Sequence, residues 1–173
     1  MHLNQMKSIL ATAILLAFMT LLYIGLHQNP SAIKSPIMHQ SMPHFKGLNV
    51  GDKSPFTDED LIGKPYFLNI WATWCSSCAV EHPVWMQFSA HHKMNIVGVL
   101  YNDNLSTASP WLKQHGNPYT HLVNDPRGKL IINLGAYGTP ETLFVDAKGV
   151  IQKRFIGPVT PAWINQTYEE FIL

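Results

Sequence analysis

The sequence predicts a three-layer α/β/α domain with a mixed central sheet, preceded by one N-terminal transmembrane helix. Three observations lead to this fold class: short apolar runs alternate with helical segments, the last two runs are joined by a tight turn, and a long uncharged apolar run opens the chain. The length of 173 residues suits one ordinary domain with an anchor, and a hydrophobic content of 46% is ample for a core.

The N-terminus indicates a membrane anchor. After a short segment, residues 1–8, no charged residue interrupts the run from Ile9 to Leu26, which as a helix would span roughly 27 Å and nearly match a bilayer core. A cleaved signal sequence usually has a shorter apolar region and a small-x-small cleavage site, which residues 27–30 do not offer. We therefore expect residues 9–26 to be an uncleaved anchor, with a cleaved signal sequence as the alternative.

The segment after the anchor is predicted to be a linker. Residues 27–43 carry several prolines and serines without a sustained apolar period, which is typical of a tether. The globular domain is then predicted to occupy residues 44–173. Lys7 lies before the anchor and Lys34 not far beyond it, so the charge bias only leans towards an N-terminus on the inner side.

The first part of the domain shows a strand, a helix and a second strand. The apolar, aromatic-rich run Pro65–Trp71 is typical of a buried central strand, and it leads directly into two cysteines. A helix is predicted from Ser76 to Ala90, and Pro83 is expected to kink it or to end its first part. The run Asn95–Tyr101 predicts the next buried strand.

The middle of the domain shows shorter elements. A helix is predicted from Ser106 to His115, and Gly116-Asn-Pro118 would stop it. A further strand is expected near Thr120–Val123, followed by a turn and a short helix over Lys129–Leu134.

The chain ends with a hairpin and a helix. The runs Glu141–Asp146 and Val150–Ile156 flank the three-residue turn 147–149, which fits a β-hairpin. Residues Pro161–Leu173 are predicted to form an amphipathic helix. Alternating strands and helices followed by a hairpin favour a mixed rather than a purely parallel sheet.

Composition excludes two classes of protein. Twelve Lys and Arg against eleven Asp and Glu give a formal charge of +1, so the broad positive surface of a nucleic-acid-binding protein is not expected. Only two cysteines occur, Cys75 and Cys78, which excludes the multi-bridge framework of a small secreted domain. The two cysteines must therefore be explained as a pair.

The position of the pair gives each cysteine a chemical role. Cys75 is predicted at the N-terminus of a helix, where unpaired backbone N–H groups and the helix dipole favour a thiolate. It is the predicted catalytic nucleophile. Cys78 lies one turn further on, where it can attack a mixed disulfide formed by Cys75 and release the partner in its reduced state. It is the predicted resolving thiol.

A structural disulfide, a zinc site and a haem attachment site are the alternatives for this pair. A purely structural disulfide that closes about four residues would contribute only about 2 kcal/mol by loop entropy. A zinc site could use Cys75, Cys78 and His82, but it needs a fourth ligand and the chain has no second cysteine pair. Covalent haem attachment needs a histidine directly after the second cysteine, where the chain has Ala79.

Several segments resemble a known family. The segment Leu68-Asn-Ile-Trp-Ala-Thr-Trp-Cys-Ser-Ser-Cys78, followed by Glu81 and His82, looks like the active site of thioredoxin-like proteins, and more narrowly it is similar to the CcmG/DsbE family of cytochrome c biogenesis. Further similar segments cover almost the whole domain: Val97-Gly-Val-Leu-Tyr101, Trp111-Leu-Lys-Gln-His-Gly-Asn-Pro-Tyr119 and Leu134-Gly-Ala-Tyr-Gly-Thr-Pro-Glu-Thr-Leu-Phe-Val-Asp146.

The resemblance implies a fold, a reaction and partners. The fold would be thioredoxin-like, and the protein would reduce the Cys-x-x-Cys-His disulfide of apocytochrome c before haem attachment. Electrons would arrive from a membrane thiol-disulfide transporter of the DsbD/CcdA type. The protein would sit in the inner membrane by a single-pass anchor, with its catalytic domain in the periplasm. No cofactor or metal is expected beyond the redox-active pair of cysteines.

The resemblance also implies residues that support the cysteines. Thr139–Pro140 would be a cis peptide bond against the sulfurs, and the backbone of Thr139 would pair with an extended substrate. We also expect Pro140 to leave a free sheet edge at the strand that follows. Trp74, Ser76 and Ser77 adjoin the cysteines and are predicted to belong to the active site.

Two positions depart from the family pattern. The dipeptide Ser76-Ser77 lacks the proline that most members have, and Ala79 stands where a basic residue is common. The buried acid of general thioredoxins is also replaced, by Asn69, six residues before Cys75. Like its relatives, this protein would need another proton acceptor.

Glu81 and Glu141 are the candidates for that acceptor. Glu81 lies one turn beyond Cys78, and Glu141 follows Pro140, so either carboxylate could be carried near the sulfurs. For each, a solvated surface carboxylate is the alternative. His82 could modulate the site, although a partly exposed helix position is the simpler interpretation, and His91-His92 are expected to form a polar helix end.

Two other functions stay open at this point. One is a broader extracytoplasmic reductase of the TlpA/ResA type, which would differ in its substrate. The other is a Sco-like copper chaperone that would use Cys75, Cys78 and a distant histidine such as His121. The cysteines of Sco-type proteins are spaced one residue wider than here.

Overall fold

The computed structural model describes residues 2–26 and 37–172. The chain divides into two compact units, Met1–Lys34 and Ser35–Leu173, and each is described by itself. Most of the predicted linker, residues 27–36, lies outside the described residues.

In the described part of the first unit, helix α1 spans His2–Leu26 and so begins within the predicted N-terminal segment 1–8. Its stretch Gln5–Gly25 is long and apolar enough to cross a membrane. The two threonine hydroxyls in this stretch donate back to the helix, from Thr12 Oγ1 to Ser8 O (3.0 Å) and from Thr20 Oγ1 to Leu16 O (2.6 Å). Such bonds satisfy the hydroxyls without a partner outside the helix.

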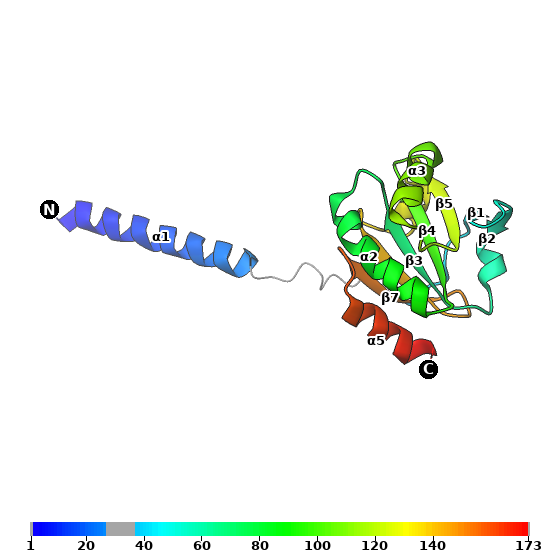
Figure 1. The fold of residues 1–173 in the computed structure, drawn as a ribbon. Helices are drawn as coiled ribbons and strands as arrows, with labels where there is room; N and C mark the ends of the chain where they lie inside the picture. Colours follow the sequence, from blue (N-terminus) through cyan, green and yellow to red (C-terminus); the bar gives the residue numbers. More distant parts are fainter. Residues whose placement is uncertain (1, 27–36, 173) are drawn as a thin grey trace. The chain divides into compact units, whose positions relative to one another are not determined.

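The second unit is built on one mixed sheet of seven strands in the order β2-β1-β5-β4-β3-β6-β7 (Figure 1). Strands β3, β4 and β5 run parallel, and every other pair of neighbours runs antiparallel. This arrangement confirms the predicted mixed sheet. The strands are β1 (Lys46–Asn49), β2 (Pro55–Thr57), β3 (Tyr66–Trp71), β4 (Asn95–Tyr101), β5 (His121–Asp125), β6 (Glu141–Val145) and β7 (Ile151–Ile156).

The sheet has a hydrophobic cluster on each face, because the side chains of its central strands alternate. Phe67 and Trp71 of β3 pack in one cluster with residues of α2 (Ser76–His91), α3 (Leu105–His115) and α5 (Pro161–Ile172). Leu68 and Ile70 pack in the other cluster with residues of α4 (Lys129–Asn133) and of the N-terminal part of the unit. The three-layer architecture is thus confirmed, and the predicted elements end within two residues of their expected bounds.

Helix α2 is continuous from Ser76 to His91, so Pro83 does not end its first part, and the break expected there is wrong. Pro83 is exposed, and it removes only the one backbone bond that its missing N–H would have donated. Burial of Trp85 and Phe88 holds the second part of the helix against the sheet.

The domain begins earlier than His44, where the sequence places its start. Ile37 and Met42 are buried in the core, and Ser41 forms an isolated β-bridge with Val150. Residues 37–43 are therefore part of the domain rather than of the tether. Their apolar side chains, Ile37, Met38 and Met42, are too few to establish a strand or helix period.

A small antiparallel hairpin, β1 with β2, and the 3₁₀ turn η2 (Asp58–Leu61) have no counterpart in the sequence-based expectations. Strand β1 extends the sheet through β5, with Leu48 opposite Leu122. Gly47 is required there, since a Cβ atom at this position would lie 2.5 Å from Leu122 O and 2.4 Å from the Phe56 ring.

Candidate active site

The two cysteines lie where β3 gives way to α2, and they form a disulfide. Cys75 is the N-cap of α2, with extended backbone angles (φ −87°, ψ 106°), and its Sγ accepts the Cys78 N–H at 3.1 Å. This is the helix-terminal geometry that the sequence predicts for the nucleophile. Both residues are largely covered in the oxidised form, with 7% of Cys75 and 4% of Cys78 exposed.

The turn before Cys75 is fixed by the end of the neighbouring strand β4. Asp103 Oδ2 accepts both the backbone N–H (2.8 Å) and the hydroxyl (2.6 Å) of Thr73. Burial raises the pKa of Asp103, but the hydrogen bonds from Thr107, Thr73 and Asn104 outweigh it and the pKa lies below its usual value. Asp103 therefore holds the active-site turn as a carboxylate.

Trp74 and the two serines form the outer surface of the site. The Trp74 side chain is exposed, and its Nε1 donates to Asn102 O at 3.1 Å, which fixes the orientation of the indole. Ser76 and Ser77 are exposed in the first turn of α2. A partner molecule approaching Cys75 would meet these three side chains first.

Glu81 is buried on the inner side of α2, one turn beyond Cys78, with 2% of it exposed. Its Oε1 accepts from Asn69 Nδ2 at 2.7 Å, and its Oε2 accepts the Val159 N–H at 2.8 Å. Burial is the largest influence and raises the pKa of Glu81 to about 7, although these hydrogen bonds oppose it. A solvated surface position, the alternative for this residue, is wrong.

Asn69 links Glu81 to two further polar groups. Its Oδ1 accepts from Tyr119 Oη at 2.9 Å, and its Nδ2 also donates to Thr142 Oγ1 at 3.1 Å. Because the amide oxygen is bound to a hydroxyl donor, the amide nitrogen must face the carboxylate. The sequence does not single out Tyr119 and Thr142 as site residues, although Tyr119 ends the Gly-Asn-Pro-Tyr segment.

The Thr139–Pro140 peptide bond is cis, as the resemblance implies. The free sheet edge expected beside it is wrong, because β6 pairs with β3 on one side and with β7 on the other. Pro140 O itself accepts the Gly157 N–H at 3.0 Å. A substrate strand that pairs with the backbone at this point would therefore use residues before Pro140.

Glu141 lies on the other face of the sheet from Glu81. Thr142 contacts Asn69 on the α2 side, and its neighbours Glu141 and Leu143 must point to the opposite side, where Leu143 packs in the cluster with α4. Glu141 is buried and forms an ion pair with Arg154, whose Nε lies 2.5 Å from its Oε1. The structure thus places Glu81, but not Glu141, in the polar network behind the cysteines.

Comparison with known proteins agrees with this geometry. The redoxin family matches residues 38–170. The DsbE-2 thiol:disulfide interchange protein of Pasteurella multocida is 42% identical over 88% of this chain and 80% of its own length. The thiol:disulfide interchange protein DsbE of Pseudomonas fluorescens is 41% identical over 85% of this chain and 82% of its own. The chain belongs to the DsbE family.

Solved structures of DsbE-like proteins share the fold. A thiol:disulfide interchange protein of Chlorobium tepidum superimposes with a TM-score of 0.62 at 27% identity, covering 76% of this chain and 94% of the other. As a member of the DsbE family with a redoxin domain and a Cys75–Cys78 disulfide, the protein is a thiol-disulfide oxidoreductase.

The two histidines considered above as metal ligands, His82 and His121, make other contacts. His82 Nε2 is 3.1 Å from Gly116 O, its ring packs on Trp111, and burial lowers its pKa. His121 begins β5 opposite Val97 and stacks on Phe56, so it lies towards the sheet end away from Cys75. Within residues 2–26 and 37–172, no group of three or more His, Cys, Asp or Glu side chains is placed to hold a metal ion.

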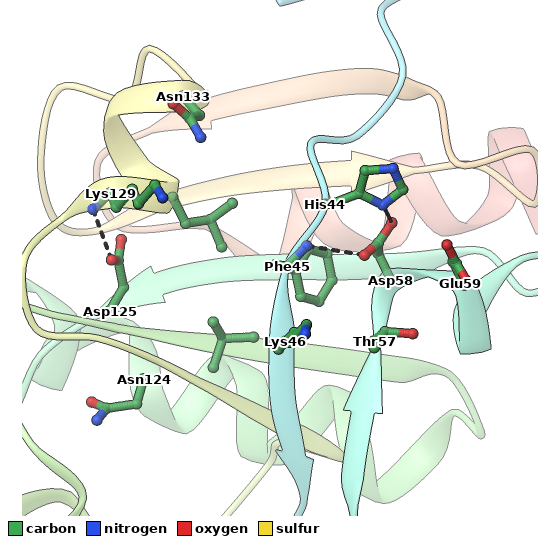
Figure 2. Close-up of a pocket in the computed structure, with 12 residues that line it drawn as sticks. His44, Phe45, Lys46, Thr57, Asp58, Glu59, Asn124, Asp125, Lys129 and Asn133 are labelled. Atoms are coloured by element: carbon green, nitrogen blue, oxygen red, sulfur yellow. Dashed lines mark hydrogen bonds and ion pairs between the residues drawn. The ribbon is translucent and has the colours of Figure 1, made fainter.

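A cavity of about 600 Å³ lies between the N-terminal hairpin and α4, on the face opposite α2 (Figure 2). Its rim is polar, and there Asp58 binds His44 and the Phe45 N–H, while Asp125 binds the Lys129 N–H. These hydrogen bonds join the segment before β1 to η2, and β5 to α4. Both carboxylates therefore have partners within the domain and are not presented to a ligand. The predicted site residues lie outside this cavity.

Proposed function

We propose that this DsbE-family protein reduces the Cys-x-x-Cys-His disulfide of apocytochrome c before haem attachment. Its electrons would come from a membrane thiol-disulfide transporter of the DsbD/CcdA type. The observation that carries the proposal is the match to DsbE proteins over more than four fifths of the chain, together with a helix-terminal cysteine pair of the required kind.

The reaction balances as two exchanges. In the reduced protein the Cys75 thiolate attacks one sulfur of the substrate disulfide, and the other substrate sulfur leaves as a thiolate. The Cys78 thiolate then attacks Cys75 Sγ in the mixed disulfide, which forms the Cys75–Cys78 bond and releases the second substrate thiolate. Two electrons pass to the substrate, and its two thiolates take up two protons.

Glu81 supports the second exchange as the proton acceptor for Cys78. With a pKa of about 7, it can both accept and release a proton near neutral pH, and it lies one helical turn from Cys78 on the same side of α2. The Asn69 amide and the Val159 N–H hold the carboxylate in place.

The proposal also includes the cellular location of the protein. Helix α1 is apolar enough to span a membrane, and we propose that it anchors the protein in the inner membrane with the catalytic domain in the periplasm. Cytochrome c receives its haem outside the cytoplasm in this family, so the proposed substrate and the domain would share a compartment.

A mixed-disulfide trap tests the proposal. In Cys78→Ala the resolving thiol is gone, so Cys75 is expected to remain bonded to its substrate and to retain apocytochrome c on non-reducing gels and by mass spectrometry. Cys75→Ala is the matched control and should trap nothing.

The trap also separates the proposal from a broader reductase. Recovery of many unrelated proteins with no enrichment of apocytochrome c would favour a reductase of the TlpA/ResA type. Equal kcat/KM for a Cys-x-x-Cys-His peptide and for one with the histidine replaced would point the same way.

A further inference from the structure

The segment between α4 and β6, residues 135–140, lies at the end of the sheet where the cysteines are. It leads into β6 at Glu141, which pairs with Ile70 near the end of β3, and Cys75 follows that strand after a short turn. The position of this segment therefore decides what surface a peptide meets beside Cys75.

One side chain from β7, that of Arg154, contacts the segment at two points and the first residue of β6 at a third. Arg154 Nη2 donates to Gly135 O at 3.0 Å, and its guanidinium lies over the Tyr137 ring, 4.8 Å from the ring centre. Its Nε forms the ion pair with Glu141 described above. Glu141 in turn accepts the Tyr137 N–H through Oε2 at 3.1 Å, so the pair binds the start and the middle of the segment, and Glu141 itself directly follows its end.

The register of the hairpin explains how the pair forms. Arg154 lies opposite Leu143 and Ile156 opposite Glu141, so Arg154 and Glu141 are diagonal neighbours on one face. Only 5% of the Arg154 side chain and 1% of the Glu141 side chain are exposed. Arginine keeps its charge when buried, so each partner needs the other to offset its desolvation.

A guanidinium is required for all three contacts at once. Its planar fork can pair with a carboxylate, donate to a carbonyl and stack on an aromatic ring in a single orientation, whereas an ammonium group acts as a point charge. Tyr137 keeps 61% of its surface exposed although its ring rests on Arg154, so the ring remains available to a peptide.

We propose that Arg154 is a positioning residue for peptide substrates, holding residues 135–140 in the conformation against which the substrate lies. Glu141 acts through Arg154 and takes no part in proton transfer. The inference rests on the proposed function only in assuming that the natural substrate is a peptide disulfide.

The test compares peptide and small disulfides with Arg154→Lys in the full-length protein. The lysine keeps a charge for Glu141 but loses the stacking on Tyr137 and the bond to Gly135. We expect kcat/KM for peptide disulfides to fall about tenfold, mainly through KM. The rate with hydroxyethyl disulfide and the equilibrium constant for thiol-disulfide exchange with glutathione should each stay within about twofold of wild type, because the cysteines and the Glu81 network are untouched.

Two further variants keep the result interpretable. Lys153→Gln removes the neighbouring cation, which pairs instead with Glu170 of α5, and it should behave as wild type on every substrate. If Arg154→Lys fails to fold, the double variant Glu141→Gln with Arg154→Gln replaces the buried ion pair by two neutral amides, and it should show the same selective loss.

The outcomes are distinct. Equal loss on peptide and small disulfides, or no loss on either, would overturn the positioning role. If Glu141→Gln shifts the pH profile for reduction of the small disulfide, Glu141 does take part in proton transfer, and the role assigned to it here is wrong. If wild type shows no preference for the Cys-x-x-Cys-His peptide, the proposed function fails, but the contrast between any peptide and the small disulfide still tests Arg154.

Discussion

Replacing Glu81 by Gln is expected to remove a pH dependence from the stability of the protein. Below pH 4.5, the ordinary value, Glu81 is protonated in both the folded and the unfolded chain. Between pH 4.5 and about 7 the unfolded chain loses this proton and the folded protein keeps it, so the free energy of unfolding falls as pH rises. Above pH 7 the full cost of the buried carboxylate is present.

The magnitude follows from the same two pKa values. The gap between 4.5 and about 7 corresponds to about 3 kcal/mol at 1.4 kcal/mol per tenfold step. The glutamine of Glu81→Gln would not ionise, but its amide can satisfy only one of the two donors, Asn69 Nδ2 and the Val159 N–H, which costs about 1–3 kcal/mol at every pH. The pH dependence is therefore the diagnostic quantity, rather than the stability at one pH.

Urea unfolding of the oxidised protein, followed by tryptophan fluorescence from pH 4 to pH 8, measures this directly. The stability of Glu81→Gln relative to wild type should rise by about 3 kcal/mol across that range. Burial also lowers the pKa of His82, but any contribution of this residue is common to both proteins and cancels in the difference. The exposed Glu169→Gln is the matched control. A difference that stays flat within about 0.5 kcal/mol would refute the assignment.

Four other predictions follow from the same contacts. Asp103→Asn should cost about 1–2 kcal/mol at neutral pH by weakening the bonds to Thr73, and the cost should shrink as pH falls below 3.8, because the pKa of Asp103 lies below that value and the carboxylate is lost in acid; urea unfolding at a series of pH values from 7 downwards checks this. Asn69→Asp should place two carboxylates together and lower stability at pH 8 relative to pH 5 by more than about 3 kcal/mol in the same assay. In the reduced protein, alkylation against pH should reveal Cys75 as the faster thiol, titrating below about 8.5, and a faster Cys78 would reverse the roles. Membrane fractions should retain the full-length protein with its domain open to protease only from outside, whereas a soluble main form starting near residue 28 would disprove the anchor.

The elements that the sequence predicts well are those whose signal is local. The strand Asn95–Tyr101 has the bounds expected for it, because a continuous apolar run of that length between polar segments is typical of a buried strand. The cysteine pair and its place at the start of α2 follow equally from neighbouring residues. The cis bond at Thr139–Pro140 comes from the resemblance instead, since no local pattern specifies it.

The features that the sequence does not reveal depend on distant partners. Strand β1 has only four residues and includes Gly47, and it is held by packing of Phe45 on Phe56 and by its pairing with β5. Asp103 holds Thr73 across thirty positions of sequence. The pairing of Glu141 with Arg154 depends on the register of the β6–β7 hairpin. The local sequence, a glutamate after a proline, does not indicate that register.

The position of the acid explains how one fold keeps the same chemistry with different residues. General thioredoxins, by the resemblance noted above, carry a buried acid on the strand before the cysteines, where this chain has Asn69. The carboxylate of Glu81 reaches the same buried region from α2, and its Oε1 lies 2.7 Å from Asn69 Nδ2. Because Tyr119 holds the amide with its nitrogen towards Glu81, the strand position now supplies a hydrogen-bond donor to the acid. With the acid on the helix, Glu81 lies one turn from Cys78, the position from which we propose that it accepts the Cys78 proton in the second exchange, in which the mixed disulfide is released.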